Sequence, residues 1–135
     1  MPVMQWTEQL SVKIDSIDNE HKKLIELINK LFDAMSRREG HNVLDTILKE
    51  LTDYTEFHFH HEEEALEKYN YPGIAAHKKE HESFVNKIED TKKKYEEGAI
   101  MLTIPLVDFL TTWIKEHILK SDMGYSPFLV KAGMK

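Results

Sequence analysis

Three histidines and three glutamates stand within seven residues in the segment HFHHEEE, His58 to Glu64. Imidazole nitrogens and carboxylate oxygens bind transition metals, but a run of this kind is also typical of a charged helix face exposed to water. The direction of the side chains decides between these interpretations. An inward subset predicts a buried metal site, whereas an outward set predicts only a solvated surface.

A helical projection separates the six polar residues of this segment. At about 100° per residue, the apolar residues between Leu44 and Leu66 fall in one arc centred near His58. Glu62 lies inside that arc and His61 lies at its edge. The residues predicted to face water are His60, Glu63 and Glu64. The segment therefore contributes one inward pair, His58 and Glu62.

The same projection places at least one inward histidine on each of four predicted helices. The five inward histidines are His21, His58, His77, His81 and His117. His41, His60 and His61 are interpreted as surface residues. One histidine on an apolar face is usually a core residue with an ordinary hydrogen-bond partner. Five of them would need five partners in a core with few other polar groups, so a shared metal is favoured.

The number of inward ligands predicts two metal ions. Five imidazoles and one glutamate exceed the roughly four ligands that one zinc ion takes. A second carboxylate is offered by Asp122, five residues after His117, where the fourth helix is expected to fray. On an ideal helix the two residues are offset by about 140°, so the alternative is that Asp122 is an exposed acid.

Two metals with about six ligands each have roughly twelve positions. Five histidines, two bridging carboxylates and a bridging oxo or hydroxo oxygen leave one position empty. This mixture of ligands favours iron, although manganese, cobalt or zinc could load in vitro. The di-iron plan built on Glu-x-x-His requires that motif on two helices, and this sequence does not contain it.

Composition bounds the setting of such a site. The 135 residues are enough for one domain, expected to span residues 1–135, and the formal net charge of −6 argues against nucleic-acid and anionic-membrane partners. There are no cysteines, so thiolate ligands and disulfides are excluded. The sequence shows neither a leader segment nor an apolar run of about 18 residues. We expect a cytoplasmic protein.

Helical periodicity and turn signals predict an all-α, up-down-up-down four-helix bundle. Residues 1–16 lack a helical stripe and are expected to form an extended arm, with Ser16 or Asp18 capping the first helix and Thr103 capping the fourth. The tail from Ser121, with Gly124 and Pro127, is expected to break the last helix. The predicted helices cover residues 17–38, 42–69, 74–97 and 104–120.

The ordered motifs resemble the hemerythrin family, specifically the single-domain bacterial hemerythrins (bacteriohemerythrins). The matching segments are IDNEH ending at His21, HFHHEE from His58, HKKEH from His77 and HILKSD from His117. The resemblance implies two irons with an oxo or hydroxo bridge. It implies that His77, His81 and His117 saturate one iron, that His21 and His58 leave the other open, and that Glu62 and Asp122 bridge them.

The resemblance also implies a function, which is reversible dioxygen binding for carriage, storage or local supply, without catalysis. The apolar wall of the dioxygen pocket is expected to contain Leu24, Phe59, Trp113, Ile114 and Leu119, all of which could otherwise be ordinary core residues. Dioxygen is the expected ligand, the chain is expected to be a monomer, and an oxygen-consuming enzyme is a candidate recipient. The alternatives are an enzyme handling peroxide, nitric oxide or a small substrate, a sensor, and a structural metal bundle.

Overall fold

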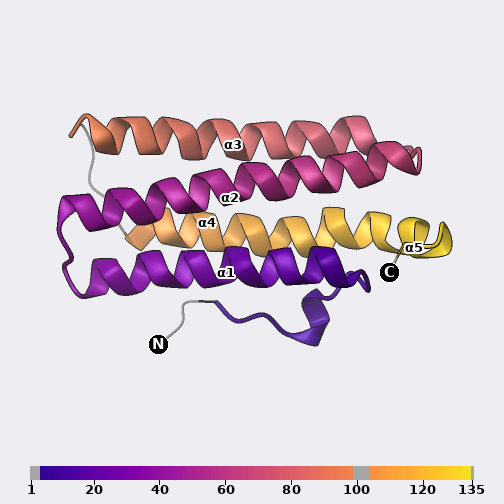
Figure 1. Cartoon of the computed structure of the whole chain (residues 1–135), viewed down its shortest axis with the longest axis horizontal. Coiled ribbons are helices and arrows are strands. Elements are labelled where there is room, and N and C mark those ends of the chain that lie inside the picture. The colour runs from indigo at the N-terminus through magenta and orange to yellow at the C-terminus, as the bar shows by residue number, and fades with distance from the viewer. Residues whose placement is uncertain (1–3, 99–103, 135) are drawn as a thin grey trace.

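Four long helices, each antiparallel to the one before it in the chain, form the computed structural model, which describes residues 4–98 and 104–134 (Figure 1). Helix α1 spans Asp15–Ser36, α2 spans His41–Lys68, α3 spans Ile74–Glu96 and α4 spans Ile104–Glu116. No strand occurs among the described residues. The predicted all-α, up-down-up-down four-helix bundle is confirmed, while the single-domain span of residues 1–135 stays a prediction.

The first three helices end close to their predicted positions because the local sequence stops them. Helix α2 ends in a Schellman motif, in which the Tyr71 N–H donates to the Leu66 carbonyl at 2.9 Å and Asn70 takes a positive φ of 56°. A β-carbon at Gly73 would lie 2.8 Å from the Tyr71 ring, so any other residue at this position would displace that ring.

The predicted break after Ser121 is wrong, because the chain stays helical to Lys131. Helix α4 continues as a π-helical turn, η2 (His117–Asp122), and then as α5 (Met123–Lys131), which contains Pro127. Proline removes one backbone hydrogen bond from a helix. Burial of Tyr125, Ser126 and Leu129 against other elements outweighs that loss.

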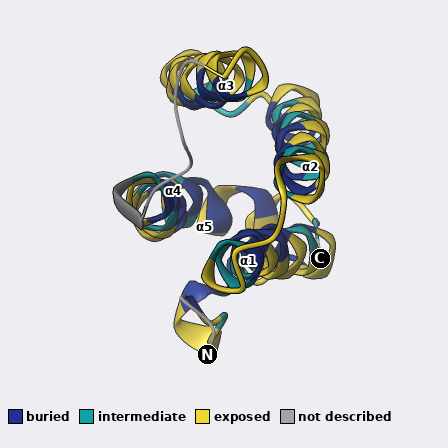
Figure 2. Cartoon of the chain, turned by 90° about the vertical axis from the view of Figure 1, so that its left-hand side faces the viewer, coloured by how far each residue is buried: buried dark blue, intermediate teal, exposed yellow. Residues whose placement is uncertain are grey.

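The elements pack around two apolar clusters that lie one beyond the other along the bundle. In cross-section α1 neighbours α2 and α4, and α3 neighbours α2 (Figure 2). The larger cluster fills the bundle between the four long helices and includes Leu24, Phe59 and Ile114. The smaller cluster lies at the α5 end. Its buried members are Val12, Ile14, Ile17, Leu66, Tyr125 and Leu129.

The N-terminal segment closes the α5 end of the bundle. Between residues 4 and 14 it contains one short 3-10 helix, η1 (Glu8–Leu10), and no other helix. Asp18 is buried and accepts hydrogen bonds from the Val12 N–H at 2.8 Å and the Ser11 hydroxyl at 2.5 Å. The Ser126 hydroxyl donates to the Val12 carbonyl at 2.5 Å. The segment is therefore tied to both α1 and α5.

The N-caps predicted for the first and fourth helices are not seen among the described residues. Helix α1 begins at Asp15 with Ile14 at the N-cap and no side-chain cap. Ser16 and Asp18 therefore lie inside the first turn and do not cap it, and the Asp18 carboxylate instead accepts hydrogen bonds from the N-terminal segment. Thr103 lies outside the described residues.

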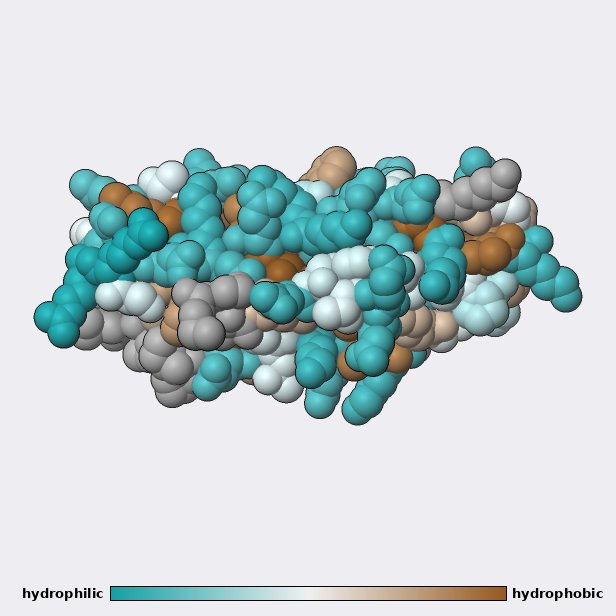
Figure 3. Space-filling view, turned by 90° about the horizontal axis from the view of Figure 1, so that it is seen from below, coloured by the Kyte–Doolittle hydropathy of each residue, from teal (hydrophilic) through white to brown (hydrophobic). Residues whose placement is uncertain are grey.

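The surface on the side of α1 and the N-terminal segment is mainly hydrophilic, with small separate apolar patches (Figure 3). Within residues 4–98 and 104–134, no helix has the length and apolar character that a membrane span requires.

The anchoring role of Asp18 predicts a loss of stability in Asp18→Ala. The variant leaves the buried Val12 N–H without its acceptor, which costs about 1–3 kcal/mol in the free energy of unfolding. Urea denaturation of the full chain measures this value. Asp15→Ala is the control, because Asp15 is exposed at the start of α1 and its loss should cost under about 1 kcal/mol. Equal losses in the two variants would contradict the anchoring role.

Candidate metal centre

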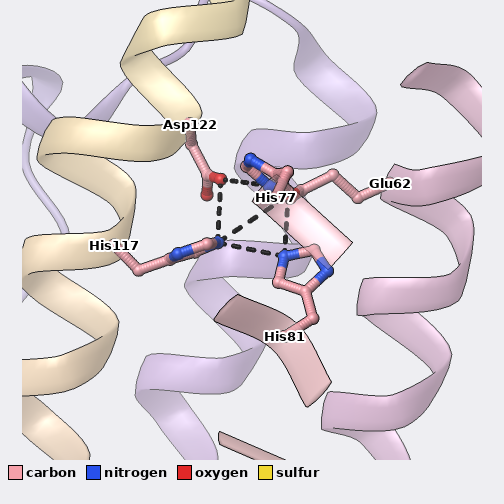
Figure 4. A group of neighbouring side chains, drawn as sticks. All are labelled: Glu62, His77, His81, His117 and Asp122. Carbon is pink, nitrogen blue, oxygen red and sulfur yellow. Dashed lines mark hydrogen bonds and ion pairs between the residues drawn. The ribbon is translucent and has the colours of Figure 1, made fainter. Parts of the chain in front are cut away.

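All seven predicted ligands meet in the interior of the bundle. His21 lies on α1, His58 and Glu62 on α2, His77 and His81 on α3, and His117 and Asp122 at the two ends of η2. None is more than 6% exposed, and both carboxylates are 0% exposed. Figure 4 shows five of the seven side chains pointing toward one common position.

Glu62 and Asp122 each divide their two oxygens between two groups of histidines. Glu62 Oε1 contacts the Nε2 atom of His77 and lies 3.2 Å from Nε2 of His81, while Oε2 lies 3.1 Å from Nε2 of His58. Asp122 Oδ1 lies 3.1 Å from Nε2 of His77, and Oδ2 lies 3.1 Å from Nε2 of His21. A three-histidine group and a two-histidine group therefore share the same pair of carboxylates.

The π-helical turn brings Asp122 into this position. A π-helix closes hydrogen bonds from residue i to residue i+5, so its turn accommodates one residue more than an α-turn. His117 and Asp122 stand five residues apart within this turn, and Asp122 Oδ1 lies 3.1 Å from His117 Nε2. The expectation that the helix frays here is wrong, although Asp122 does reach the other ligands. The alternative of an exposed acid is excluded by its complete burial.

Hydrogen bonds among the ligand side chains do not satisfy all of their polar atoms, whereas metal ions would. His81 Nδ1 and Glu63 lie 2.8 Å apart, which places the His81 proton on Nδ1 and a lone pair on Nε2. That Nε2 lies 3.0 Å from the Nε2 of His117. Buried atoms without a hydrogen-bond partner in the described structure include both nitrogens of His21, one oxygen of Glu62 and both of Asp122. Cations coordinated by these atoms would satisfy them.

The carboxylates and imidazoles of the site shift one another's pKa values. Burial lowers the pKa of His21, but the carboxylates of Asp122 and Glu62 outweigh burial and raise the pKa to about 9. The same opposition raises the pKa of His77 to about 9 and that of His117 to about 10. For Glu62, burial raises the pKa, but contacts with the histidines hold it well below its ordinary value. In the absence of metal, the carboxylates thus retain protons on His21, His77 and His117.

Aromatic rings cover the three-histidine group. The Phe59 ring stacks on His81 with centroids 3.8 Å apart, and the Trp113 ring stacks on His117 at 4.5 Å. Leu24, Phe59 and Ile114 are buried in the larger apolar cluster, and Trp113 is half-buried against it. Their role as the wall of a dioxygen pocket stays a prediction.

The prediction for Leu119 is wrong, because this side chain is 41% exposed. Leu119 follows His117 by two residues and therefore lies on the far face of the same turn. It lines a surface hollow with Gln5 and Thr111. The neighbouring Ile118 is buried in the larger cluster instead.

Four residues that the sequence did not indicate also contact the ligands of the site. Glu20 lies 2.6 Å from Nδ1 of His58, and Glu80 lies 3.5 Å from Nδ1 of His117. Glu63, predicted to face water, instead contacts His81. Tyr125 of α5 is fully buried beside His77, with ring centroids 5.4 Å apart. These contacts cross between helices, so periodicity within one helix could not reveal them.

Two of the three remaining histidines are exposed, as predicted. His60 is 77% exposed and pairs with Glu64 at 2.9 Å, and His41 is exposed beside Tyr95. His61 is only half-buried, and its Nδ1 lies 2.6 Å from Glu20. His61 thus lies at the surface, as interpreted, but it also contacts Glu20.

Comparison with solved structures identifies close relatives of this fold. A structure described as wild-type hemerythrin superposes with a TM-score of 0.90 at 31% sequence identity, covering 94% of this chain and 98% of the other. A structure of a hemerythrin point mutant gives a TM-score of 0.91 at 32% identity, covering 96% and 98% of the two chains.

Comparison of sequences leads to the same family. The chain is 37% identical to the bacteriohemerythrin of Clostridium acetobutylicum over 89% of its own length and 96% of the relative. It is 32% identical to the bacteriohemerythrin of Methylococcus capsulatus, covering 96% and 98% of the two chains. Residues 12–129 match the hemerythrin HHE cation binding domain. With the fold and the clustered ligands in agreement, the chain belongs to the hemerythrin family.

Proposed function

We propose that this protein binds dioxygen reversibly at a dinuclear non-haem iron centre. His77, His81 and His117 would hold one iron, His21 and His58 would hold the other, and Glu62 and Asp122 would bridge both, together with an oxo or hydroxo oxygen. The observation that carries the proposal is the division of each carboxylate between the two histidine groups. When bound, the iron pair supplies reversible electron transfer to dioxygen.

The unequal numbers of histidines support an open position on one side. Three imidazoles serve one group and two serve the other, while both groups share the same carboxylates. A centre that takes about six ligands is therefore one ligand short on the side of His21 and His58. A closed structural site would not leave such a position.

The surrounding residues keep water away from that position. His21 and His58 are each 1% exposed, and Leu24 and Ile114 are buried in the adjoining apolar cluster. Exclusion of water suppresses the escape of reduced oxygen species and unwanted proton transfer. The chain thus provides the enclosure that reversible binding requires.

Oxygen binding is favoured over catalysis because the neighbouring acids are already engaged. Glu20 and Glu63 each contact the Nδ1 atom of a ligand histidine. Burial and the charges of Asp122 and Glu62 raise the pKa of Tyr125 well above its ordinary value, so its phenol keeps its proton at neutral pH. None of the three is poised as a general base. Peroxide or nitric oxide chemistry and sensing remain the alternatives.

The wider setting of this activity consists of predictions. A monomeric state, a cytoplasmic location and an oxygen-consuming recipient are part of the proposal, and oligomer analysis and cell fractionation would test the first two.

Metal content and optical reversibility test the proposed function directly. Protein from iron-supplemented growth should contain two irons per chain, because the ligands divide into two groups. The reduced protein should gain colour in air and lose it under vacuum over repeated cycles. One iron per chain would contradict the dinuclear centre. Irreversible conversion in the first cycle would indicate catalysis or sensing instead.

Asp122→Ala should cause loss of iron or a single irreversible oxidation in air. The substitution removes one anionic ligand from each iron in a dry core, a change that typically costs several kcal/mol. Iron analysis and repeated optical cycles measure the effect. Asp108→Ala is the matched control, because Asp108 is an exposed acid on α4 and its loss should leave both readouts unchanged. Reversible oxygen binding by Asp122→Ala with two irons retained would sink the bridging role.

Iron binding at pH 7 should release at least three protons per chain, since the pKa values of His21, His77 and His117 are raised to about 9, 9 and 10 without metal and that of His58 is raised as well. Metal requires the neutral imidazole, so the displaced protons compete with iron below these values. Affinity should therefore rise with pH, and proton release should diminish as pH approaches 9 to 10. Anaerobic titration with ferrous iron in a pH-stat counts the protons. Release of less than one proton per chain would contradict the protonated cluster.

A further inference from the structure

Glu20 connects a buried ligand of the metal centre to a histidine at the protein surface. Its Oε1 lies 2.6 Å from Nδ1 of His58 in a hydrogen bond, and its Oε2 lies 2.6 Å from Nδ1 of His61. The second contact has the distance of an ion pair but not the angle of a hydrogen bond. Glu20 is 13% exposed on α1, and both histidines lie on α2. The contact therefore spans the α1–α2 seam.

Among the described residues, the two-histidine side of the centre has one outer carboxylate, Glu20, whereas the three-histidine side has two. Neither ring nitrogen of His21 has a hydrogen-bond partner in the described structure. On the three-histidine side, Glu63 contacts His81 and Glu80 lies near His117. The His58 ring is thus the one ring of the two-histidine pair that an outer carboxylate orients.

The surface partner of Glu20 is itself held in place. The Phe57 ring, 60% exposed, stacks on His61 with centroids 6.4 Å apart and planes 20° apart. His61 is 36% exposed, against 1% for His58. A continuous series of contacts therefore leads from solvent to the metal centre, through Phe57, His61, Glu20 and His58.

We propose that Glu20 is a positioning residue for the two-histidine metal position, and that His61 anchors it. The Glu20 carboxylate holds the proton of His58 on Nδ1, which leaves the lone pair of Nε2 directed at the metal. His61 contacts the second oxygen and restricts rotation of the carboxylate. The inference rests on the proposed function, because it assigns His58 as a ligand of one of two irons.

Glu20→Gln removes the charge and keeps the shape of the side chain. The amide has one oxygen and no negative charge, so it cannot accept the His58 N–H on one oxygen and present a second, charged oxygen to His61. A neutral acceptor also forms a weaker hydrogen bond than a carboxylate. Loss of such an outer partner typically lowers metal affinity about 10- to 100-fold. The iron beside His21 and His58 should leave first.

The experiment measures iron loss from the full-length, iron-loaded and reduced protein to a ferrous chelator under anaerobic conditions. Glu20→Gln should lose one of its two irons about 10- to 100-fold more readily than wild type. Glu64→Gln is the matched control, because Glu64 forms the same kind of contact with the exposed His60. It should match wild type. Equal iron retention by the two variants would overturn the proposal.

A second readout separates positioning from a merely structural role. In the proton NMR spectrum of the reduced protein in deuterated water, the shifted signal of the His58 Nδ1–H should disappear faster in Glu20→Gln than in wild type, because that proton exchanges faster. Increased iron loss with unchanged exchange would overturn the positioning role.

The surface anchor is tested separately. His61→Ala should lose the same iron as Glu20→Gln by a smaller factor, whereas His60→Ala should behave like wild type. This pair also decides the proposal if Glu20→Gln does not fold, and equal behaviour of the two variants would overturn it. Wild-type protein without two irons would instead refute the proposed function.

Discussion

Two carboxylates with no exposure to solvent lie among five imidazoles, and the rest of the fold depends on how their charge is compensated. An unpaired buried carboxylate is strongly unfavourable, because the interior replaces the water that would solvate it. Glu62 and Asp122 are compensated by histidines from α1, α2 and α3 and from the π-helical turn that follows α4. Protons or metal ions supply the positive charge. Each helix must therefore keep its register relative to the others.

Tertiary enclosure makes this charge arrangement sustainable. The larger apolar cluster lies on one side of the ligands, and the smaller cluster around Tyr125 lies on the other. The smaller cluster requires the N-terminal segment, which Asp18 and Ser126 fasten through the backbone of Val12. The extension of the last helix through α5 contributes both Tyr125 and Ser126. Segments outside the four-helix body thus complete the walls of the metal centre.

A layer of carboxylates outside the ligands gives the two sides of the centre different support. The Glu63 carboxylate accepts a hydrogen bond from His81 and the Glu20 carboxylate accepts one from His58, whereas Glu80 lies 3.5 Å from Nδ1 of His117 without a hydrogen bond. Such outer partners set the tautomer and the direction of each imidazole. Because Glu20 also contacts His61, the two-histidine side is linked to the surface of the α1–α2 seam.

Helical periodicity in the sequence was sufficient to predict the bundle and the five inward histidines. Each of these predictions depends on residues within one helix, where a spacing of 3.6 residues per turn assigns a face. Glu62 was identified in the same way, four residues after His58. Asp122 was selected for the right site but with the wrong geometry, because a π-helical turn carries it there and no fraying occurs. Leu119 was assigned to the pocket wall from the family pattern. It follows His117 by two residues, however, so its side chain lies on the opposite, exposed face of the turn.

By itself, the sequence determined which residue types could bind metal, how many there are and which face of each helix they occupy. Only the tertiary structure decided how the carboxylate oxygens divide between the two histidine groups, since that depends on distances between helices. It also decided that α5 continues past Pro127, because burial against the N-terminal segment outweighs the local preference to break. The tertiary structure also decided which histidine each outer carboxylate contacts. Glu20 and His58 are 38 residues apart in the chain, and packing of α1 on α2 alone brings them together.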